Sequence, residues 1–278
     1  RDGRAARQDP LLRHRGLAGP LGRCRRRRQR ARLPNTQQAA QIRRGTRTMT
    51  TRDTPGWAFF DVDDTLIRIK SMFDFFRYWS RVQRGDEALL ARFEADFARM
   101  RGAGVPRTDL NRAYYQYFAG VRPDELEAAG TNWAAMRLAG ADRLFLPESC
   151  RLLDQLRTSG KAPVFVSGSF AAILEPIAAR LGVAHILATT MLVGPDGRLT
   201  GGIGVPQTIG AGKADAIALF LRRTGVDPAV CVAVGDDMSD LPMLEAVGSG
   251  IAVGEGTALA AHARARDWPV LPGCEAAA

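Results

Sequence analysis

The sequence has little of what several common protein classes require. Its four cysteines are widely scattered and form no Cys-x-x-Cys pair, so a reducing cytoplasm is the expected compartment. Cys231 falls in a predicted buried strand, where a free cysteine behaves as a small hydrophobic residue. None of the three histidines, His14, His185 and His262, lies beside a serine or cysteine suited to be a nucleophile. This argues against a histidine phosphatase or a catalytic triad.

Long apolar runs are also missing. The longest, residues 181–193, is interrupted by His185, Thr189 and Thr190 and falls short of the roughly 18 residues that a membrane helix needs. The arginines near the start of the chain are not followed by the apolar core of a signal peptide. We therefore expect no contact with a membrane.

Acidic residues are nearly absent from residues 1–48. This leader holds 15 of the 39 Lys+Arg and two acids, 15 − 2 = +13, whereas the remainder carries 24 − 27 = −3. The formal charge of +10 therefore belongs to the leader, whose composition predicts disorder. A nucleic-acid arm or a targeting peptide are alternatives. We favour an upstream extension of the reading frame, with Met49 as the natural start, and do not expect nucleic acid as a partner.

Two carboxylates close the apolar run that begins at Trp57. Asp61 and Asp63 are two positions apart, so in an extended chain their side chains fall on the same side of the strand end. Carboxylates this close repel unless a cation or a shared proton compensates, and Mg²⁺ prefers such oxygen ligands. For this motif alone, a solvated turn followed by a threonine cap is the alternative.

Two later segments offer groups that suit a phosphate. Residues 161–166 form a predicted strand that runs into Ser167-Gly168-Ser169, whose small side chains leave the amides accessible. Lys213 follows a flexible glycine turn at the start of a predicted helix, where it can present a point charge. Taken singly, an ordinary turn and a solvated lysine are the default interpretations of these segments.

A third predicted strand, residues 230–234, ends in acids. Asp236 and Asp240 are four positions apart and share one face if the loop turns into a helix. No base lies near them in the sequence to pair with them. A metal ion is again the expected compensation.

In this order, the four segments resemble the motifs of the haloacid dehalogenase (HAD) superfamily of phosphohydrolases. Those motifs are Asp-x-Asp-x-Thr/Val, a strand ending in Ser or Thr, a lysine, and Gly-Asp-x-x-x-Asp. Over residues 57–272 the sequence supplies Asp61-Val62-Asp63-Asp64-Thr65, Ser167, Lys213 and Gly235-Asp236-Asp237-Met238-Ser239-Asp240. The helical stretch after the first motif and the last segment, residues 265–271, are similar to subfamily IB, the phosphoserine-phosphatase-like group.

Periodicity divides the chain into alternating elements. Helices are expected at residues 71–79, 87–100, 109–118 and 123–138, and strands near residues 57–61, 162–167, 185–188, 230–234, 250–253 and 269–271. The expected fold is α/β, a doubly wound parallel sheet (a HAD-like Rossmannoid core) with an inserted helical cap. The expected parts are a leader, residues 1–48; the core, residues 49–70 and 145–272; the cap, residues 71–144; and a tail, residues 273–278. Residues 194–197 predict the turn of a small β-hairpin attached to the core.

The resemblance implies a Mg²⁺-dependent phosphomonoesterase and a role for each motif residue. Asp61 is implied as the nucleophile that becomes an aspartyl-phosphate, and Asp63 as the acid and base. The implied magnesium ligands are Asp61, the Asp63 backbone carbonyl and Asp236, with Asp240 positioning a metal-bound water or the lysine. Ser167, the Gly168 amide and Lys213 are implied to bind the phosphoryl group. Asp237 occupies a free position of the motif and is expected to be a bystander.

The residues after the first motif predict a substrate other than phosphoserine. Phosphoserine phosphatases carry an acid there that meets the substrate ammonium, whereas residues 66–71 contain Arg68, Lys70 and no acid. If either base faces the cap, a small sugar, polyol or hydroxy-acid phosphate is favoured; if both point to solvent, no preference follows. A phosphoserine phosphatase proper and a phosphotransferase or mutase stay open as alternatives. The oligomeric state is not predicted.

Overall fold

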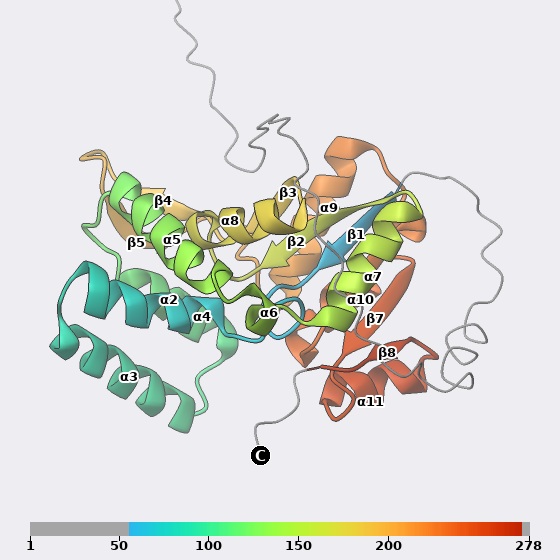
Figure 1. The fold of residues 1–278 in the computed structure, drawn as a ribbon, viewed down its shortest axis with the longest axis horizontal. Helices are drawn as coiled ribbons and strands as arrows, with labels where there is room; N and C mark the ends of the chain where they lie inside the picture. The colour runs from blue at the N-terminus through green and yellow to red at the C-terminus, as the bar shows by residue number, and fades with distance from the viewer. Residues whose placement is uncertain (1–55, 274–278) are drawn as a thin grey trace, which may run out of the picture.

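The structure, a computed structural model, describes residues 56–273 (Figure 1). The predicted leader and all but the first residue of the predicted tail lie outside the described residues. One parallel sheet of six strands forms the centre, in the order β3-β2-β1-β6-β7-β8. Its strands are β1 (Gly56–Phe60), β2 (Lys161–Ser167), β3 (His185–Ala188), β6 (Val232–Gly235), β7 (Ser249–Val253) and β8 (Val270–Leu271).

The strand order reverses beside β1. The chain first builds β2 and β3 on one side of β1 and then returns to build β6, β7 and β8 on the other. The prediction of a doubly wound parallel α/β sheet is confirmed. Because all six strands run in parallel, their carboxyl ends share one edge, and such sheets bind ligands at that edge where the order reverses.

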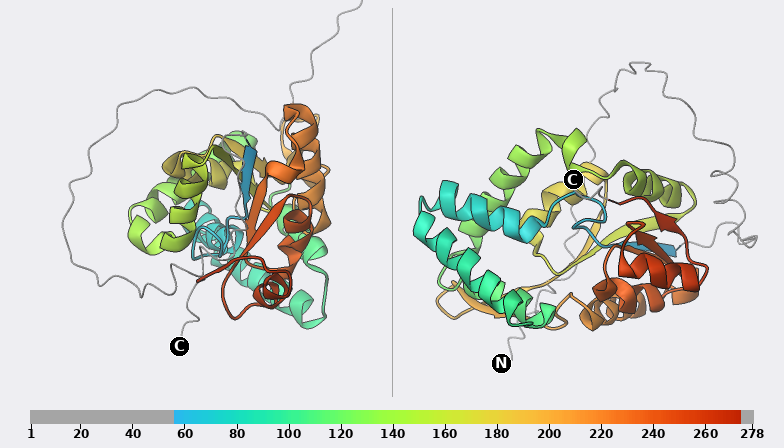
Figure 2. Two further views of the ribbon diagram at one scale, coloured as in Figure 1. Left: turned by 90° about the vertical axis from the view of Figure 1, so that its right-hand side faces the viewer. Right: turned by 90° about the horizontal axis from the view of Figure 1, so that it is seen from below.

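Helices cover both faces of the sheet (Figure 2). One face carries α7 (Pro147–Thr158) and α8 (Ala171–Leu181), and the other carries α9 (Ala211–Thr224), α10 (Leu241–Glu245) and α11 (Ala258–Ala265). Successive β1 residues alternate between them: Phe60 belongs to the buried cluster that contains Leu153 of α7, whereas Phe59 belongs to the one that contains Ile217 of α9. This double burial explains why the strands are apolar without interruption.

A separate group of helices lies beside the sheet, between β1 and α7 in the chain (Figure 1). It consists of α2 (Ser71–Tyr78), a π-helical turn η1 (Trp79–Gln83), α3 (Glu87–Gly102), α4 (Arg107–Gln116), α5 (Pro123–Leu138) and α6 (Ala141–Leu144). Asp86 caps α3 by accepting a hydrogen bond from Leu89 N at 2.8 Å. Aromatic rings fill the interior of this helical layer; Phe76 and Phe93 stack with centroids 3.9 Å apart.

The predicted hairpin is formed by β4 (Met191–Val193) and β5 (Leu199–Ile203), which pair antiparallel. Its contacts differ from the expectation of an appendage on the core. Gly120 N donates to Leu199 O at 2.7 Å and Leu199 N donates to Val121 O at 2.8 Å, so the hairpin extends the helical layer. Gly201, with φ +79°, makes this close approach possible, because a Cβ there would lie 3.1 Å from the Gln116 backbone.

One strand begins later than predicted. Pro228–Val230 forms a 3₁₀ turn, η2, capped by Asp227, which accepts from Ala229 N at 2.9 Å. Cys231 therefore precedes β6 rather than lying in it, although its side chain is buried as expected. Among residues 56–273, no helix combines the length and hydropathy that crossing a bilayer requires.

Candidate active site

Asp61 and Lys213 meet at the carboxyl edge of the sheet. Asp61 is the first residue after β1 and is still tied to β6, because its N–H donates to Val234 O at 2.9 Å. The Lys213 ammonium donates to Asp61 Oδ1 and to Asp240 Oδ1, both at 2.6 Å. The Lys213 side chain is only 4 % exposed, so the alternative of a solvated lysine is wrong. Burial works against the ammonium, yet Asp240 and Asp61 raise the pKa of Lys213.

Asp240 is held by both the lysine and the backbone. Its Oδ2 accepts from Asp236 N at 3.1 Å and from Asp237 N at 3.2 Å. No base lies near these acids in the sequence; Lys213 reaches Asp240 from a distant part of the chain, and a contact between them was one of the roles that the resemblance implied for Asp240. The helix η3 spans only Met238–Asp240, so Asp236 precedes it and does not share a helical face with Asp240.

Two glycines let the backbone approach closely here. A Cβ on Gly235 would lie 2.6 Å from the Asp240 Cβ, and one on Gly212 would lie 1.7 Å from Gln207 O. Both distances are too short for any side chain. The glycines of these two motifs therefore serve the packing that seats Asp240 and Lys213.

Asp63 sits in a different environment from Asp61. Its Oδ2 accepts a hydrogen bond at 2.9 Å from the backbone N–H of Ser71, which is the first residue of α2. Its buried Oδ1 has no hydrogen-bond partner among the described residues. Burial, followed by the nearby Asp61, raises the pKa of Asp63 to about 7. A carboxyl group with such a pKa can give and take a proton near neutral pH.

One oxygen from each of Asp61, Asp236 and Asp240 lies within 4.8 Å of the other two. Burial, and then the neighbouring Asp61, raises the pKa of Asp236 to about 8, since two carboxylates this close resist joint ionisation. Both Asp240 oxygens are already bonded to Lys213 and backbone amides. The residues fit a cation between Asp61 and Asp236, because it would neutralise this repulsion with the oxygen donors that Mg²⁺ prefers. We call Asp61, Asp236, Asp240 and Lys213 the acidic cluster.

The two bases after the first motif differ in position. Both side chains are exposed, but the Lys70 ammonium lies 2.8 Å from Asp64 Oδ2 and 4.0 Å from Asp236 Oδ2. Although burial opposes it, Asp236 and Asp64 raise the pKa of Lys70. Asp64 itself has a left-handed backbone with φ 59°. Lys70 thus carries a positive charge to the rim of the acidic cluster.

The segment Ser167-Gly168-Ser169 leaves the end of β2 beside β1. The Ser167 side chain is buried, and its Oγ accepts from Ser169 N at 3.1 Å. Thr65, in the first motif, is also buried and donates to Asp236 Oδ1 at 3.0 Å. The Thr65–Asp236 bond joins the residues that follow β1 and β6, and β2, which pairs with β1, ends beside them.

Asp237, expected to be a bystander, makes contacts with the helical layer and with η3. It forms an ion pair with Arg107, the first residue of α4, and accepts from Ser239 N at 2.8 Å. Burial alone would raise the pKa of Asp237, but Ser239 and Arg107 lower it. The neighbour of Asp236 therefore connects the sheet to the helical layer.

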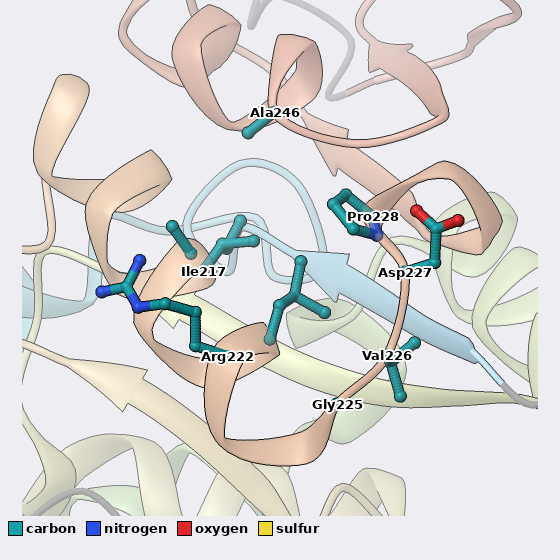
Figure 3. A pocket seen from close by; sticks show the side chains of 9 residues that line it. Ile217, Arg222, Gly225, Val226, Asp227, Pro228 and Ala246 are labelled. Atoms are coloured by element: carbon teal, nitrogen blue, oxygen red, sulfur yellow. The ribbon is translucent and has the colours of Figure 1, made fainter.

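An apolar hollow of about 420 Å³ lies elsewhere, around the end of α9 (Figure 3). Its walls include Ile217, Leu221 and Val226, and the acidic cluster does not line it. It has no group suited to phosphate chemistry apart from Arg222 at its rim. We therefore keep the acidic cluster as the candidate site.

Residues 58–245 match the model of the haloacid dehalogenase-like hydrolases. The chain belongs to this family. The predicted resemblance is thereby confirmed, and the family match spans all four motifs.

Several relatives within this hydrolase family are named as phosphatases. The chain is 32 % identical over 223 residues to a "Probable phosphatase" of Mycobacterium tuberculosis, covering 77 % of this chain and 74 % of that one. It is 33 % identical over 208 residues to a phosphoserine phosphatase of Halobacterium salinarum, covering 73 % and 88 %. A further relative, at 33 % identity over 215 residues and 77 % of each chain, is the "Inhibition of morphological differentiation protein" of Streptomyces azureus. The predicted enzyme class, a HAD-family phosphatase, agrees with these names.

Solved structures share the fold of this hydrolase. A Bordetella pertussis protein of unknown function aligns with TM-score 0.69 and 26 % identity, over 79 % of this chain and 99 % of that one. A phospho-aspartyl intermediate analogue of phosphoserine phosphatase aligns with TM-score 0.53 and 18 % identity, over 79 % and 94 %. At that identity the second likeness shows the fold alone.

Some residues around the site had no signal in the sequence. Asn111 and Tyr115, both on α4, donate to Gly168 O at 2.9 and 2.6 Å. Their spacing of four positions places them on one helix face, but their partner is more than 50 residues away in the chain. Ser71 is similar, since its contact with Asp63 depends on where α2 begins.

Proposed function

We propose that the protein is a Mg²⁺-dependent phosphomonoesterase that acts on a small phosphorylated metabolite through an aspartyl-phosphate on Asp61. The observation that carries the proposal is the contrast between two neighbouring carboxyl groups. Asp61 is bonded to a buried lysine, whereas burial raises the pKa of Asp63 to about 7. A nucleophile must be unprotonated, and an acid must hold a proton near neutral pH. The pair supports these two roles.

In the first step an Asp61 oxygen attacks phosphorus, and the bond to the leaving oxygen breaks as Asp63 gives it a proton. In the second step the Asp63 carboxylate takes a proton from water, whose oxygen attacks the same phosphorus. The bond to Asp61 breaks, and inorganic phosphate leaves. Dividing one displacement into two in this way lowers the barrier of each. Asp63 serves both steps, because the proton that it donates to the leaving oxygen in the first step is replaced by the proton that it takes from water in the second.

The phosphoryl oxygens carry charge that must be balanced throughout. We assign this to the Ser167 hydroxyl, the Gly168 amide and Lys213, which lie along the carboxyl edge of β2 and at the start of α9. Asp61, Asp236 and the Asp63 backbone carbonyl would hold Mg²⁺, with Asp240 behind them fixing Lys213. When bound, the ion supplies charge neutralisation for the phosphoryl oxygens and for the carboxylate pair.

We propose the helical layer, residues 71–144, as the cap over this site. Lys70 places a base at its entrance, and residues 66–71 contain no acid to meet an ammonium group. A substrate with an extra anionic or hydroxyl-rich group is therefore preferred, such as a sugar, polyol or hydroxy-acid phosphate.

The names of several relatives favour a second candidate, phosphoserine phosphatase proper. Steady-state assays with Mg²⁺ on a panel of phosphomonoesters separate the two. We expect L-phosphoserine to have a lower kcat/KM than the best sugar, polyol or hydroxy-acid phosphate. A tenfold advantage for phosphoserine, about 1.4 kcal/mol of transition-state preference, would contradict the proposed substrate class but not the phosphatase.

A further inference from the structure

The Gly168 carbonyl is one of the points where the helical layer contacts the proposed phosphate-binding segment, Ser167-Gly168-Ser169. Tyr115 Oη donates to this oxygen at 2.6 Å and Asn111 Nδ2 donates at 2.9 Å. A carbonyl oxygen has two lone pairs, so these two donors saturate it. Both donors come from α4, whereas the acceptor lies between β2 and α8.

The other end of the same peptide unit acts on Ser167. The Ser169 N–H, which shares its peptide plane with the Gly168 carbonyl, donates to Ser167 Oγ at 3.1 Å. The Ser167 hydroxyl therefore uses a lone pair toward Ser169, and its single proton must be directed to another acceptor. Fixing the Gly168–Ser169 peptide plane thus fixes where the Ser167 hydroxyl can donate.

Packing alone does not explain these side chains. Tyr115 is fully buried and Asn111 is 7 % exposed, and burying a polar group is unfavourable unless it is bonded. Asn111 is itself held in orientation, since its Oδ1 accepts from Gln207 Nε2 at 2.9 Å. Burial raises the pKa of the Tyr115 hydroxyl, so it remains a donor. Apolar side chains at positions 111 and 115 would fill the same buried space without needing hydrogen-bond partners.

We propose that Asn111 and Tyr115 are positioning residues for phosphoryl transfer, which hold the Gly168–Ser169 peptide so that Ser167 donates to a phosphoryl oxygen. The inference rests on the proposed function, because it takes Ser167 as a phosphate ligand. It adds a coupling between the helical layer and phosphate binding. A ligand that needs the fixed peptide also favours the seated position of α4, and the effect is reciprocal.

Tyr114 offers a matched control for Tyr115. Both tyrosines are buried on α4, and each hydroxyl donates to one backbone carbonyl, Tyr114 to Met72 O at 2.8 Å. Tyr115→Phe and Tyr114→Phe therefore each remove one buried hydrogen bond to a backbone carbonyl from the same helix, and Tyr115→Phe also removes a side-chain hydrogen bond with Thr189. Both should lower the thermal midpoint by a similar amount, but only Tyr115→Phe should disturb the phosphate site.

The measurement is the inhibition constant of inorganic phosphate, together with kcat/KM for two phosphomonoesters with different leaving groups. For Tyr115→Phe we expect phosphate binding about tenfold weaker and both kcat/KM values reduced about tenfold. This is less than the roughly 10²-fold loss expected of a donor that contacts the developing charge itself. The ratio of the two kcat/KM values should stay unchanged, because the peptide acts on the phosphoryl group and not on the leaving group.

Asn111→Ser is the second variant and should weaken phosphate binding in the same way. Combining it with Tyr115→Phe should give less than the product of the single effects, because both residues hold one carbonyl. Equal phosphate inhibition in Tyr114→Phe and Tyr115→Phe, or a changed substrate ratio, would overturn the inference while leaving an active phosphatase. Wild-type protein without phosphatase activity would instead refute the proposed function. Calorimetric titration with inorganic phosphate and Mg²⁺ then tests the positioning role of Tyr115 without turnover. Weaker phosphate binding by Tyr115→Phe than by Tyr114→Phe supports this role, and equal binding overturns it.

Discussion

The edge of the sheet and the helical layer beside it hold their charged groups in different ways. At the sheet edge, Lys213 and Asp240 side chains are 4 % and 2 % exposed and bonded to each other. In the contact between the two regions, Arg107 and Asp237 are 51 % and 41 % exposed. Charge interactions are strong when water is excluded and weak when it is not.

The buried charges therefore belong to the proposed catalytic site, whereas the exposed pair attaches the helical layer to the sheet. The buried charges have no alternative partners in water, so each depends on the others and on any cation bound among them. The exposed pair can exchange its partner for solvent at little cost. We therefore expect large effects from changes in the acidic cluster and small ones from changes at the exposed contact.

The largest expected effect is from Asp61→Asn. The amide is nearly isosteric but cannot attack phosphorus, so kcat should fall by more than about 100-fold. Stability should change little, because the relieved repulsion between Asp61 and Asp236 offsets the loss of the Lys213–Asp61 ion pair, while Lys213 keeps Asp240. The checks are steady-state phosphatase assays and thermal unfolding.

Asp64→Asn is the matched control for this change. Asp64 has a positive φ that asparagine adopts equally well, and its side chain pairs with the exposed Lys70. This variant should keep most of its activity. Residual turnover above about one per cent in Asp61→Asn, with contaminants excluded, would remove Asp61 from the mechanism.

Lys213→Met should affect both stability and activity. It leaves two buried carboxylates, Asp61 and Asp240, without their cation, and breaking a buried pair in this way costs about 3–5 kcal/mol. Chemical denaturation measures this loss. Lys70→Met, at a half-exposed position, should cost far less; equal losses in the two variants would show that burial does not distinguish them.

The sheet edge was predictable because two general rules apply to it. Unbroken apolar runs mark buried strands, and parallel strands bring their following residues to one edge. Asp61, Ser167 and Asp236 are placed by these rules without knowledge of any contact. The position of the Lys213 side chain was harder to predict from the sequence, because it depends on Gly212 passing very close to Gln207 O.

The contacts of the helical layer could not be predicted in the same way. Its helices were expected from periodicity, and α5 has the expected bounds, Pro123–Leu138. Which of its side chains contact the sheet depends instead on the orientation of the helical layer relative to the sheet. Arg107 and Asp237 are 130 positions apart, and no spacing rule relates them. The same holds for Asn111 and Tyr115 with Gly168.

Removing metal should make the stability of the protein depend on pH through Asp63 and Asp236. In the unfolded chain the carboxyls of Asp63 and Asp236 lose their protons near a pKa of 3.8, but in the folded protein near about 7 and about 8. Between these values the folded state binds more protons, so its stability falls as pH rises. We expect the thermal midpoint in chelator to be several degrees lower at pH 8 than at pH 5, at about 2–4 °C for each kcal/mol.

Mg²⁺ should restore most of this loss at pH 8, because it takes over the neutralising role of the protons. Asp236→Asn should flatten the pH dependence in chelator, since one of the groups whose pKa is raised is gone. Acids whose pKa is lowered, such as Asp237, complete their ionisation below this window and do not reverse the sign. A midpoint that rises from pH 5 to pH 8 in chelator would contradict the repulsion between these carboxyls.

The smallest expected effect is at the exposed pair, where Asp237→Asn and Arg107→Gln test the contact between the two regions. Asparagine keeps the acceptor that caps η3 through Ser239 N and removes only the charge. Because both partners are substantially exposed, a double-mutant cycle in denaturant should give a coupling of about 1 kcal/mol or less, smaller still in high salt. Phosphatase kcat/KM should change by no more than a few fold, since Asp237 contacts neither Lys213 nor Asp61 by any hydrogen bond that the described residues show. A coupling above about 2 kcal/mol, insensitive to salt, would instead mean that the pair is dry in solution, and the separation between buried chemistry and exposed attachment would fail.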